Sequence, residues 1–155
     1  MKKGLILWAA VVSAVSLGGF ATAAHAQFQT PQAVVTTLYG YYGVGAGASN
    51  QGFPNDDSRT VRRFMDRSMS LLWEGSSARL SYDFFIQGQD WKLSAFKATK
   101  GQLQGQINRV VVTFKNLNET VRLTFVVIKN SDGWRIYDVE SEKRGTLRAA
   151  LKQSG

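Results

Sequence analysis

The side chains that most often carry chemistry are scarce in this sequence. His25 is the single histidine, and the chain contains no cysteine. Thiolate catalysis is therefore excluded, and every role that needs an imidazole rests on His25. Acid–base chemistry is otherwise left to carboxylates, which act as general bases when a pocket raises their pKa. Three of them come into question: Asp83, Asp90 and Asp138.

His25 lies within residues 1–26, which are typical of a cleaved secretory signal peptide. Two lysines form a positive start, residues 5–21 carry no charge, and Ala24-His25-Ala26 places small residues where a signal peptidase reads them. The uncharged run of about 17 residues is at the lower limit for crossing a bilayer, so a permanent anchor is the alternative. We predict cleavage and export to the periplasm.

The expected mature chain, residues 27–155, is long enough for one domain with a core. Loss of the two leader lysines leaves 17 basic residues against 11 acidic ones, a net charge of +6. With neither histidine nor cysteine, and without the alternating Asp and Asn of a calcium loop, we predict no cofactor and no metal site. The basic residues do not alternate with aromatic ones as in nucleic-acid modules, so we expect no nucleic acid, whereas an anionic membrane surface or an acidic envelope partner suits the charge.

Two helices are expected in the amino-terminal half. Thr30 and Pro31 begin the first, which carries an apolar stripe and ends near Gly43. The glycine-rich segment 43–55 is then a flexible surface loop or a lid over a pocket. A second helix starts at residue 57 or 58 and continues through residue 72, with these apolar residues on one side: Val61, Phe64, Met65, Met69 and Leu72.

The other side of that second helix is basic, with Asp66 as a local partner. We interpret it as a docking face for anionic lipid headgroups or an acidic partner, and an ordinary solvated surface is the alternative. The face consists of Arg59, Arg62, Arg63 and Arg67. Residues 78–86 are compatible with one or two further helical turns.

From Trp91 onward the hydrophobic period changes to two, which predicts an antiparallel meander of about four strands. The segments are 91–99, 107–115, 120–129 and 134–140. The polar face of the third strand keeps Val126 and Ile128, so we expect that face to be covered by a helix, a ligand or a second copy of the chain, as in a homodimer through the sheet. A short helix over residues 147–152 ends an α+β fold.

Parts of this pattern resemble an uncharacterised family of exported bacterial proteins with the cystatin-like cone of the nuclear transport factor two superfamily. The likeness rests on Gln89-Asp90-Trp91, Val112 to Asn116 and Gly133 to Asp138. It implies one cone-shaped domain in which a strongly curved sheet wraps the amino-terminal helices, and it implies no established activity. The hairpin 121–139 is also similar to that of periplasmic phospholipid carriers of the toluene-tolerance type, which have extra helices after the final strand.

A cone of this family has a pocket between helix and sheet, where carboxylates act as bases in enzymes of the superfamily. We predict a ligand pocket lined by Tyr82, Asp83, Gln87, Gln89, Asp90 and Trp91. Structural alternatives remain open for the carboxylates. Asp83 would cap a turn, and Asp90 would accept backbone N–H groups at the entry to the sheet. Asp138 would pair with Arg135 or Lys143. Trp91 and Trp134 are expected in the core, with ligand stacking as the alternative.

The predicted function is an exported, non-enzymatic binding or accessory protein of the bacterial cell envelope. Its partner would be an envelope protein or an apolar ligand. Two alternatives stay open: a periplasmic carrier of a lipid or other apolar ligand, and a small enzyme with Asp83 or Asp90 as general base.

Overall fold

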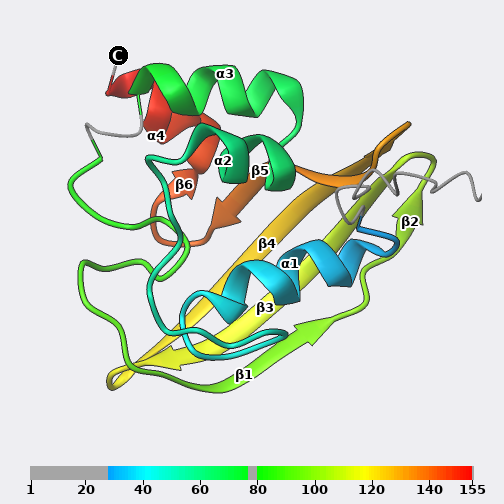
Figure 1. The fold of residues 1–155 in the computed structure, drawn as a ribbon. Coiled ribbons are helices and arrows are strands. Elements are labelled where there is room, and N and C mark those ends of the chain that lie inside the picture. Colours follow the sequence, from blue (N-terminus) through cyan, green and yellow to red (C-terminus); the bar gives the residue numbers. More distant parts are fainter. Residues whose placement is uncertain (1–27, 77–79, 155) are drawn as a thin grey trace, which may run out of the picture.

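An antiparallel sheet covered by helices makes up the part of the chain that the computed structural model describes, residues 28–76 and 80–154. The predicted signal peptide lies outside these residues. Helix α1 crosses one face of the sheet, while α2, α3 and α4 gather near β5 and β6 (Figure 1). None of the described helices is long and apolar enough to cross a membrane.

The described residues form four helices and six strands, and the strand order is β1-β3-β4-β5-β6, with β2 paired to β3. The helices are α1 (Pro31–Gly40), α2 (Ser58–Phe64), α3 (Arg67–Ser76) and α4 (Leu147–Gln153). The strands are β1 (Leu93–Thr99), β2 (Leu103–Gln104), β3 (Ile107–Asn116), β4 (Glu119–Asn130), β5 (Gly133–Ser141) and β6 (Gly145–Thr146). The α+β class, the antiparallel sheet and the short last helix are confirmed. The two-residue strands β2 and β6 were not predicted, because two residues show no alternation.

Helix α1 begins as the sequence predicts. The Thr30 hydroxyl accepts a hydrogen bond from the backbone N–H of Ala33 at 3.1 Å, and Pro31 occupies the first turn. The following segment, predicted as a loop over residues 43–55, folds back along α1. Its backbone N–H groups at Ala46 and Ser49 donate to the carbonyls of Thr36 and Gly40.

The prediction of one continuous second helix was wrong, because the chain breaks into α2 and α3 at Met65 and Asp66. Met65 is extended, with φ −92° and ψ 151°, and pairs with Ile136 of β5, whose carbonyl accepts the Asp66 N–H at 2.9 Å. The Asp66 carboxylate then accepts the N–H groups of Ser68 and Met69, each at 3.0 Å, and so caps α3. Asp66 is buried by this role and is not a partner of an exposed arginine face.

Residues 80–86 do not continue a helix, which corrects the second helical prediction for the part that is described. The chain forms a loop closed by Asp83 and Gly88, with N–O distances of 2.8 and 3.3 Å, and Gln87 adopts a φ of 57°. From this loop Phe84, Phe85 and Ile86 enter the core. The apolar residues therefore mark an irregular segment that fills the interior.

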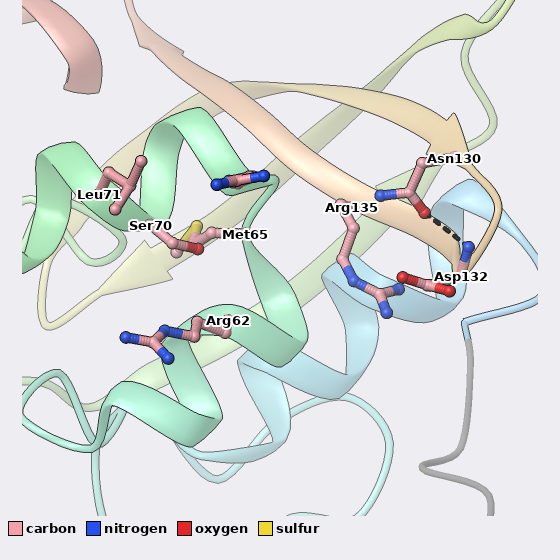
Figure 2. Close-up of a pocket in the computed structure, with 8 residues that line it drawn as sticks. Arg62, Met65, Ser70, Leu71, Asn130, Asp132 and Arg135 are labelled. Atoms are coloured by element: carbon pink, nitrogen blue, oxygen red, sulfur yellow. Dashed lines mark hydrogen bonds between the residues drawn. The ribbon is translucent and has the colours of Figure 1, made fainter.

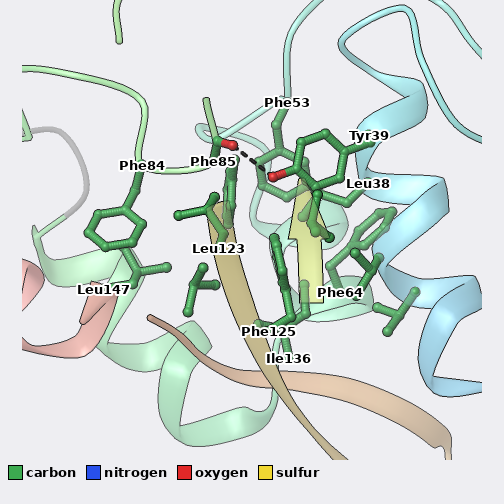
Figure 3. Packing of buried hydrophobic residues seen from close by; sticks show 14 of the residues in the cluster. Leu38, Tyr39, Phe53, Phe64, Phe84, Phe85, Leu123, Phe125, Ile136 and Leu147 are labelled. Carbon is green, nitrogen blue, oxygen red and sulfur yellow. Dashed lines mark hydrogen bonds between the residues drawn. The ribbon is translucent and has the colours of Figure 1, made fainter. Parts of the chain in front are cut away.

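Aromatic rings occupy the space between α1 and the sheet (Figure 3). Tyr39 lies at the centre, with ring centroids 4.9 Å from Phe96, 5.4 Å from Phe114 and 5.9 Å from Phe125. Its hydroxyl donates to the Phe85 carbonyl at 2.8 Å, which satisfies a buried polar group. Trp134 lies in this core as predicted.

The polar face of β4 is covered within the chain at Val126 and stays partly exposed at Thr124 and Ile128. Val126 is buried, and the register places Arg109 opposite it on β3 and Glu140 opposite Thr124 on β5. The Arg109 guanidinium bonds both Glu140 oxygens, at 2.7 and 2.8 Å, and so bridges across β4. Cover for Val126 therefore needs no second copy, and a homodimer through the sheet stays a prediction.

Arg148 joins three elements at the β5 end of the sheet. Its guanidinium bonds Asp66 at 3.0 Å and Ser68 at 2.5 Å, donates to the Tyr137 carbonyl at 2.8 Å, and lies 4.0 Å from the Tyr137 ring centroid. Tyr137 is the extra residue of a bulge between β4 and β5. The side chains of Arg148 and Asp66 are only 16% and 11% exposed, so this ion pair is largely screened from water.

We expect Arg148→Met to lower the free energy of unfolding by about 3–5 kcal/mol, because Asp66 would remain buried without its cation. Urea unfolding followed by circular dichroism measures the loss. Arg122→Met is the matched control. Arg122 pairs with Glu142 at 3.4 Å on the surface, and we expect a loss below about 1 kcal/mol there. Equal losses in the two variants would contradict the prediction.

Two helical glycines offer a second matched pair. A Cβ on Gly40 would overlap the Ala46 carbonyl oxygen, whereas a Cβ on Gly75 meets nothing within 4 Å. We expect Gly40→Ala to destabilise by about 1–3 kcal/mol because the folded-back loop must move. Gly75→Ala should stabilise by about 0.5–1 kcal/mol, since alanine favours a helix interior. Thermal unfolding of both variants checks these signs, and a gain in stability for Gly40→Ala would refute the packing of this loop.

Candidate functional site

The six residues of the predicted ligand pocket do not surround one cavity. Tyr82, Asp83 and Gln89 line a cavity of about 250 Å³. Gln87 lines a separate one of about 290 Å³, and Asp90 and Trp91 line neither. The structure therefore divides the six predicted residues between two cavities and a pair, Asp90 and Trp91, that lines neither of them.

Asp83 is held by donors on both of its oxygens. One oxygen accepts the Tyr42 hydroxyl at 2.5 Å, and the other accepts the Phe85 N–H at 2.8 Å. Burial raises the pKa of Asp83 above 3.8, although these hydrogen bonds oppose that shift. Burial also raises the pKa of Tyr42 well above 10.0, so its phenol stays protonated and keeps donating. Asp83 thus fastens the loop to the segment that follows α1, in agreement with the turn-capping alternative.

The other predicted pocket residues also make structural contacts. The Gln87 amide donates to the Phe84 carbonyl at 2.6 Å and accepts from the Ser141 hydroxyl at 2.8 Å. The exposed Gln89 donates to the Ser81 carbonyl at 2.9 Å. The Trp91 indole N–H donates to the Asn50 side chain at 2.9 Å at the surface, so Trp91 lies at the edge of the core.

Asn116 performs the role that the sequence suggested for Asp90. Its side-chain oxygen accepts the Lys92 N–H at 3.0 Å, and its amide nitrogen donates to the carbonyls of Ile86 and Asp90, each at 3.1 Å. From the sequence, Asn116 was named only as the end of the motif from Val112. Its position at the last residue of a strand was the available signal, since a buried side-chain amide can satisfy backbone groups on both sides.

Asp138 does not pair with Arg135 or Lys143, which corrects the third carboxylate prediction. Its carboxylate accepts the backbone N–H of Arg148 at 3.1 Å, in the first turn of α4. Lys143 instead reaches Glu119 at 3.4 Å. Asp138 is thus placed where a helix N-terminus favours an anion.

The predicted basic face divides between a groove and its surroundings. Arg62 and Arg67 line a groove of about 410 Å³ together with Arg135 of β5, while Arg59 is not part of the lining. Arg63 lies beside Phe28 and Phe64, with its guanidinium carbon 5.4 and 5.7 Å from their ring centroids. The groove lies between the α2–α3 junction and the β4–β5 hairpin, as Figure 2 shows, and is completed by Met65, Ser70, Leu71, Asn130 and Asp132.

Positive charge prevails in this groove. Arg62 pairs with Glu74 of α3, at 2.9 and 3.2 Å, which orients its guanidinium. Burial and the nearby Arg63 lower the pKa of Arg135, and Asp132 opposes that shift. The Arg63 Nε is buried without a hydrogen-bond partner in the described part of the chain. In the described residues Arg67 and Arg135 form no ion pair within 4.0 Å, whereas Arg62 is paired, and the Arg135 guanidinium donates to the Trp134 carbonyl at 2.9 Å.

An exposed leucine adds an apolar element to the same groove. Leu71 is 61% exposed, although it projects from the middle of α3. Sequence reasoning missed both Leu71 and Arg135, because each reads as an ordinary outward position of its helix or strand. The groove is therefore suited to an anionic ligand with an apolar part.

Across residues 28–76 and 80–154, no three acidic, histidine or cysteine side chains gather in a way that would hold a metal ion.

No protein-family model matches this chain, and no curated protein matches it. Among solved structures, it resembles a chain of the native type VI effector–immunity complex Tae3–Tai3 from Ralstonia pickettii. The TM-score is 0.56 at 15% identity, over 74% of this chain and 96% of that one. This likeness shows the fold. A phospholipid-binding protein from Ralstonia solanacearum, solved with a phospholipid, aligns over 62% of this chain and 59% of that one at 18% identity, but its TM-score of 0.35 supports no inference.

Asp83 makes the stability of the fold depend on pH with a definite sign. Because folding raises its pKa above 3.8, the folded state binds this proton more tightly than the unfolded state. Its contribution therefore favours folding below about pH 3.8 and is lost as pH rises through the folded pKa. We therefore expect the difference in the free energy of unfolding between the wild type and Asp83→Asn to decrease as the pH increases through the folded pKa of Asp83.

Urea unfolding at a series of pH values measures this difference. Tyr42→Phe is the companion variant. It removes a hydrogen bond that lowers the pKa of Asp83, so the decline should extend to higher pH. A difference between wild type and Asp83→Asn that stays constant across the series would refute the assignment.

Proposed function

We propose that the mature chain is an exported, non-enzymatic binding or accessory protein of the bacterial cell envelope, and that the arginine-lined groove holds its partner. One observation carries this proposal: three arginines and an exposed leucine line the same concave surface. Exposed apolar side chains next to uncompensated charge mark binding surfaces more often than catalytic centres.

The placement of the carboxylates supports binding over catalysis. Asp83 is occupied by Tyr42 and Phe85, and Asp138 by a backbone N–H of α4. A general base needs a free lone pair directed at a substrate proton. Asp90 is exposed outside the cavities described above.

The filled interior favours a surface ligand over an enclosed one. The Phe125 ring centroid lies 5.9 Å from that of Tyr39 and 6.2 Å from that of Phe85, in the space where a cone-shaped carrier would hold a lipid. An apolar ligand would have to displace these side chains, at a cost that close-packed cores resist. The likeness to a chain of an effector–immunity complex, an assembly of proteins, is compatible with a partner that is a protein.

A photo-cross-linking amino acid at position 71 tests the proposal in intact cells. We expect Leu71 to yield a covalent adduct on irradiation, because it is exposed inside the groove. The protein recovered from the periplasm should begin at Gln27 when its mass is measured. Leu103 of β2, which is 62% exposed outside the groove, is the matched control.

Absence of an adduct at position 71, or equal yields at positions 71 and 103, would reject the groove as the binding surface. Recovery of a protein that still carries residues 1–26 would reject the export part of the proposal.

A further inference from the structure

We infer that the occupant of the groove is a protruding acidic segment of a protein, with an apolar side chain among its carboxylates. This inference rests on the proposed function, because it names the partner of that same groove. It is carried by the shape of the groove, by Arg67 and Arg135, which form no ion pair within 4.0 Å in the described residues, and by the position of Leu71.

The arginines belong to facing walls of the groove. Arg62 and Leu71 lie on the helical side, and Arg135 and Asp132 lie on the hairpin side, as Figure 2 shows. A bilayer surface is broad, so it meets the exposed Arg62 and Arg67 more readily than the half-buried Arg135 on the opposite wall. A loop or helix that projects from a protein can enter and contact both walls.

The volume of the groove sets the size of what enters. About 410 Å³ is within the range of sites that hold small ligands, roughly 300–1,000 Å³. It therefore admits a few side chains of a partner, with the rest of that partner outside.

Guanidinium chemistry selects carboxylates. Arginine presents a planar fork of donors that matches a carboxylate in a bidentate manner, and such bonds are stronger when water is partly excluded. Arg135 is half-buried, and in the described residues neither it nor Arg67 forms an ion pair within 4.0 Å. Arg63 adds positive potential behind Arg135 without a bond at its Nε. An incoming carboxylate relieves this accumulation of like charge.

The apolar contact adds a second selectivity. Leu71 is exposed in the lining, to which the buried Met65 also contributes. Covering Leu71 with an aliphatic side chain removes its apolar surface from water, which favours binding. Asp132 is the acidic member of the lining, and it disfavours partner carboxylates at the hairpin tip. A free phosphate ion satisfies the arginines but leaves Leu71 exposed.

The test uses the mature chain and a short fluorescent peptide of alternating Glu and Leu, titrated by fluorescence anisotropy. A Gln–Leu peptide, phosphatidylglycerol vesicles and inorganic phosphate are the competing probes. We expect the Glu–Leu peptide to bind more tightly than the Gln–Leu peptide, and its affinity to fall as salt is raised.

The variants assign that binding to the groove. We expect Arg67→Gln and Arg135→Gln each to weaken the Glu–Leu peptide by about tenfold. Arg59→Gln removes the same charge from α2 outside the lining and should leave the affinity unchanged. Circular dichroism confirms the fold of each variant. Arg67 is exposed at the start of α3, so its variant keeps the test valid if Arg135→Gln unfolds.

Three results would overturn the inference: no binding of the Glu–Leu peptide, equal loss in Arg59→Gln and Arg67→Gln, or binding of vesicles or phosphate in its place. If an adduct forms at position 71 in cells, any of these results refutes only the inference that the partner is an acidic segment. The proposed binding role then stands. A missing adduct removes the binding role itself.

Discussion

The ion pair between the largely buried side chains of Arg148 and Asp66 is the interaction on which the rest of this structure depends. The Arg148 guanidinium bonds Asp66, which follows the extended Met65 and caps α3, and it also bonds the carbonyl of Tyr137 in the β5 bulge. Two charges this far from water are tolerated only when their remaining donors and acceptors are also satisfied. Here the backbone of β5 and the first turn of α3 supply those partners, so three elements are fixed relative to one another.

The groove is a geometric result of the same arrangement. Because Met65 pairs with Ile136, α2 and α3 meet at the edge of β5, and their arginines come to face Arg135. Repulsion between these like charges lowers the stability of the fold. An exposed ion pair such as Arg62–Glu74 offsets little of that loss. The aromatic core between α1 and the sheet stabilises the domain enough for such a surface to persist.

Long periodic segments were predictable, and interactions between distant segments were not. Alternation over β3 and β4 and the cap at Thr30 are local signals, so these elements were found. The break at Asp66 was missed because the apolar period runs on across it, and only pairing with β5 reveals it. Arg148 reads as a routine basic residue in a last helix, and nothing local indicates burial. The arginines of α2 and α3 drew attention by density, whereas Arg135 joined them only through the fold.

The outer edge of β5 is paired at separate points by segments from both ends of the sequence. The Trp134 N–H donates to Phe28, the Ile136 carbonyl accepts from Asp66, and residues 140–141 pair with β6. Residues 28–66 therefore lack these partners until the last third of the polypeptide has been synthesised. We therefore expect a nascent chain of this protein to complete its fold late in synthesis and to stay accessible to chaperones until then.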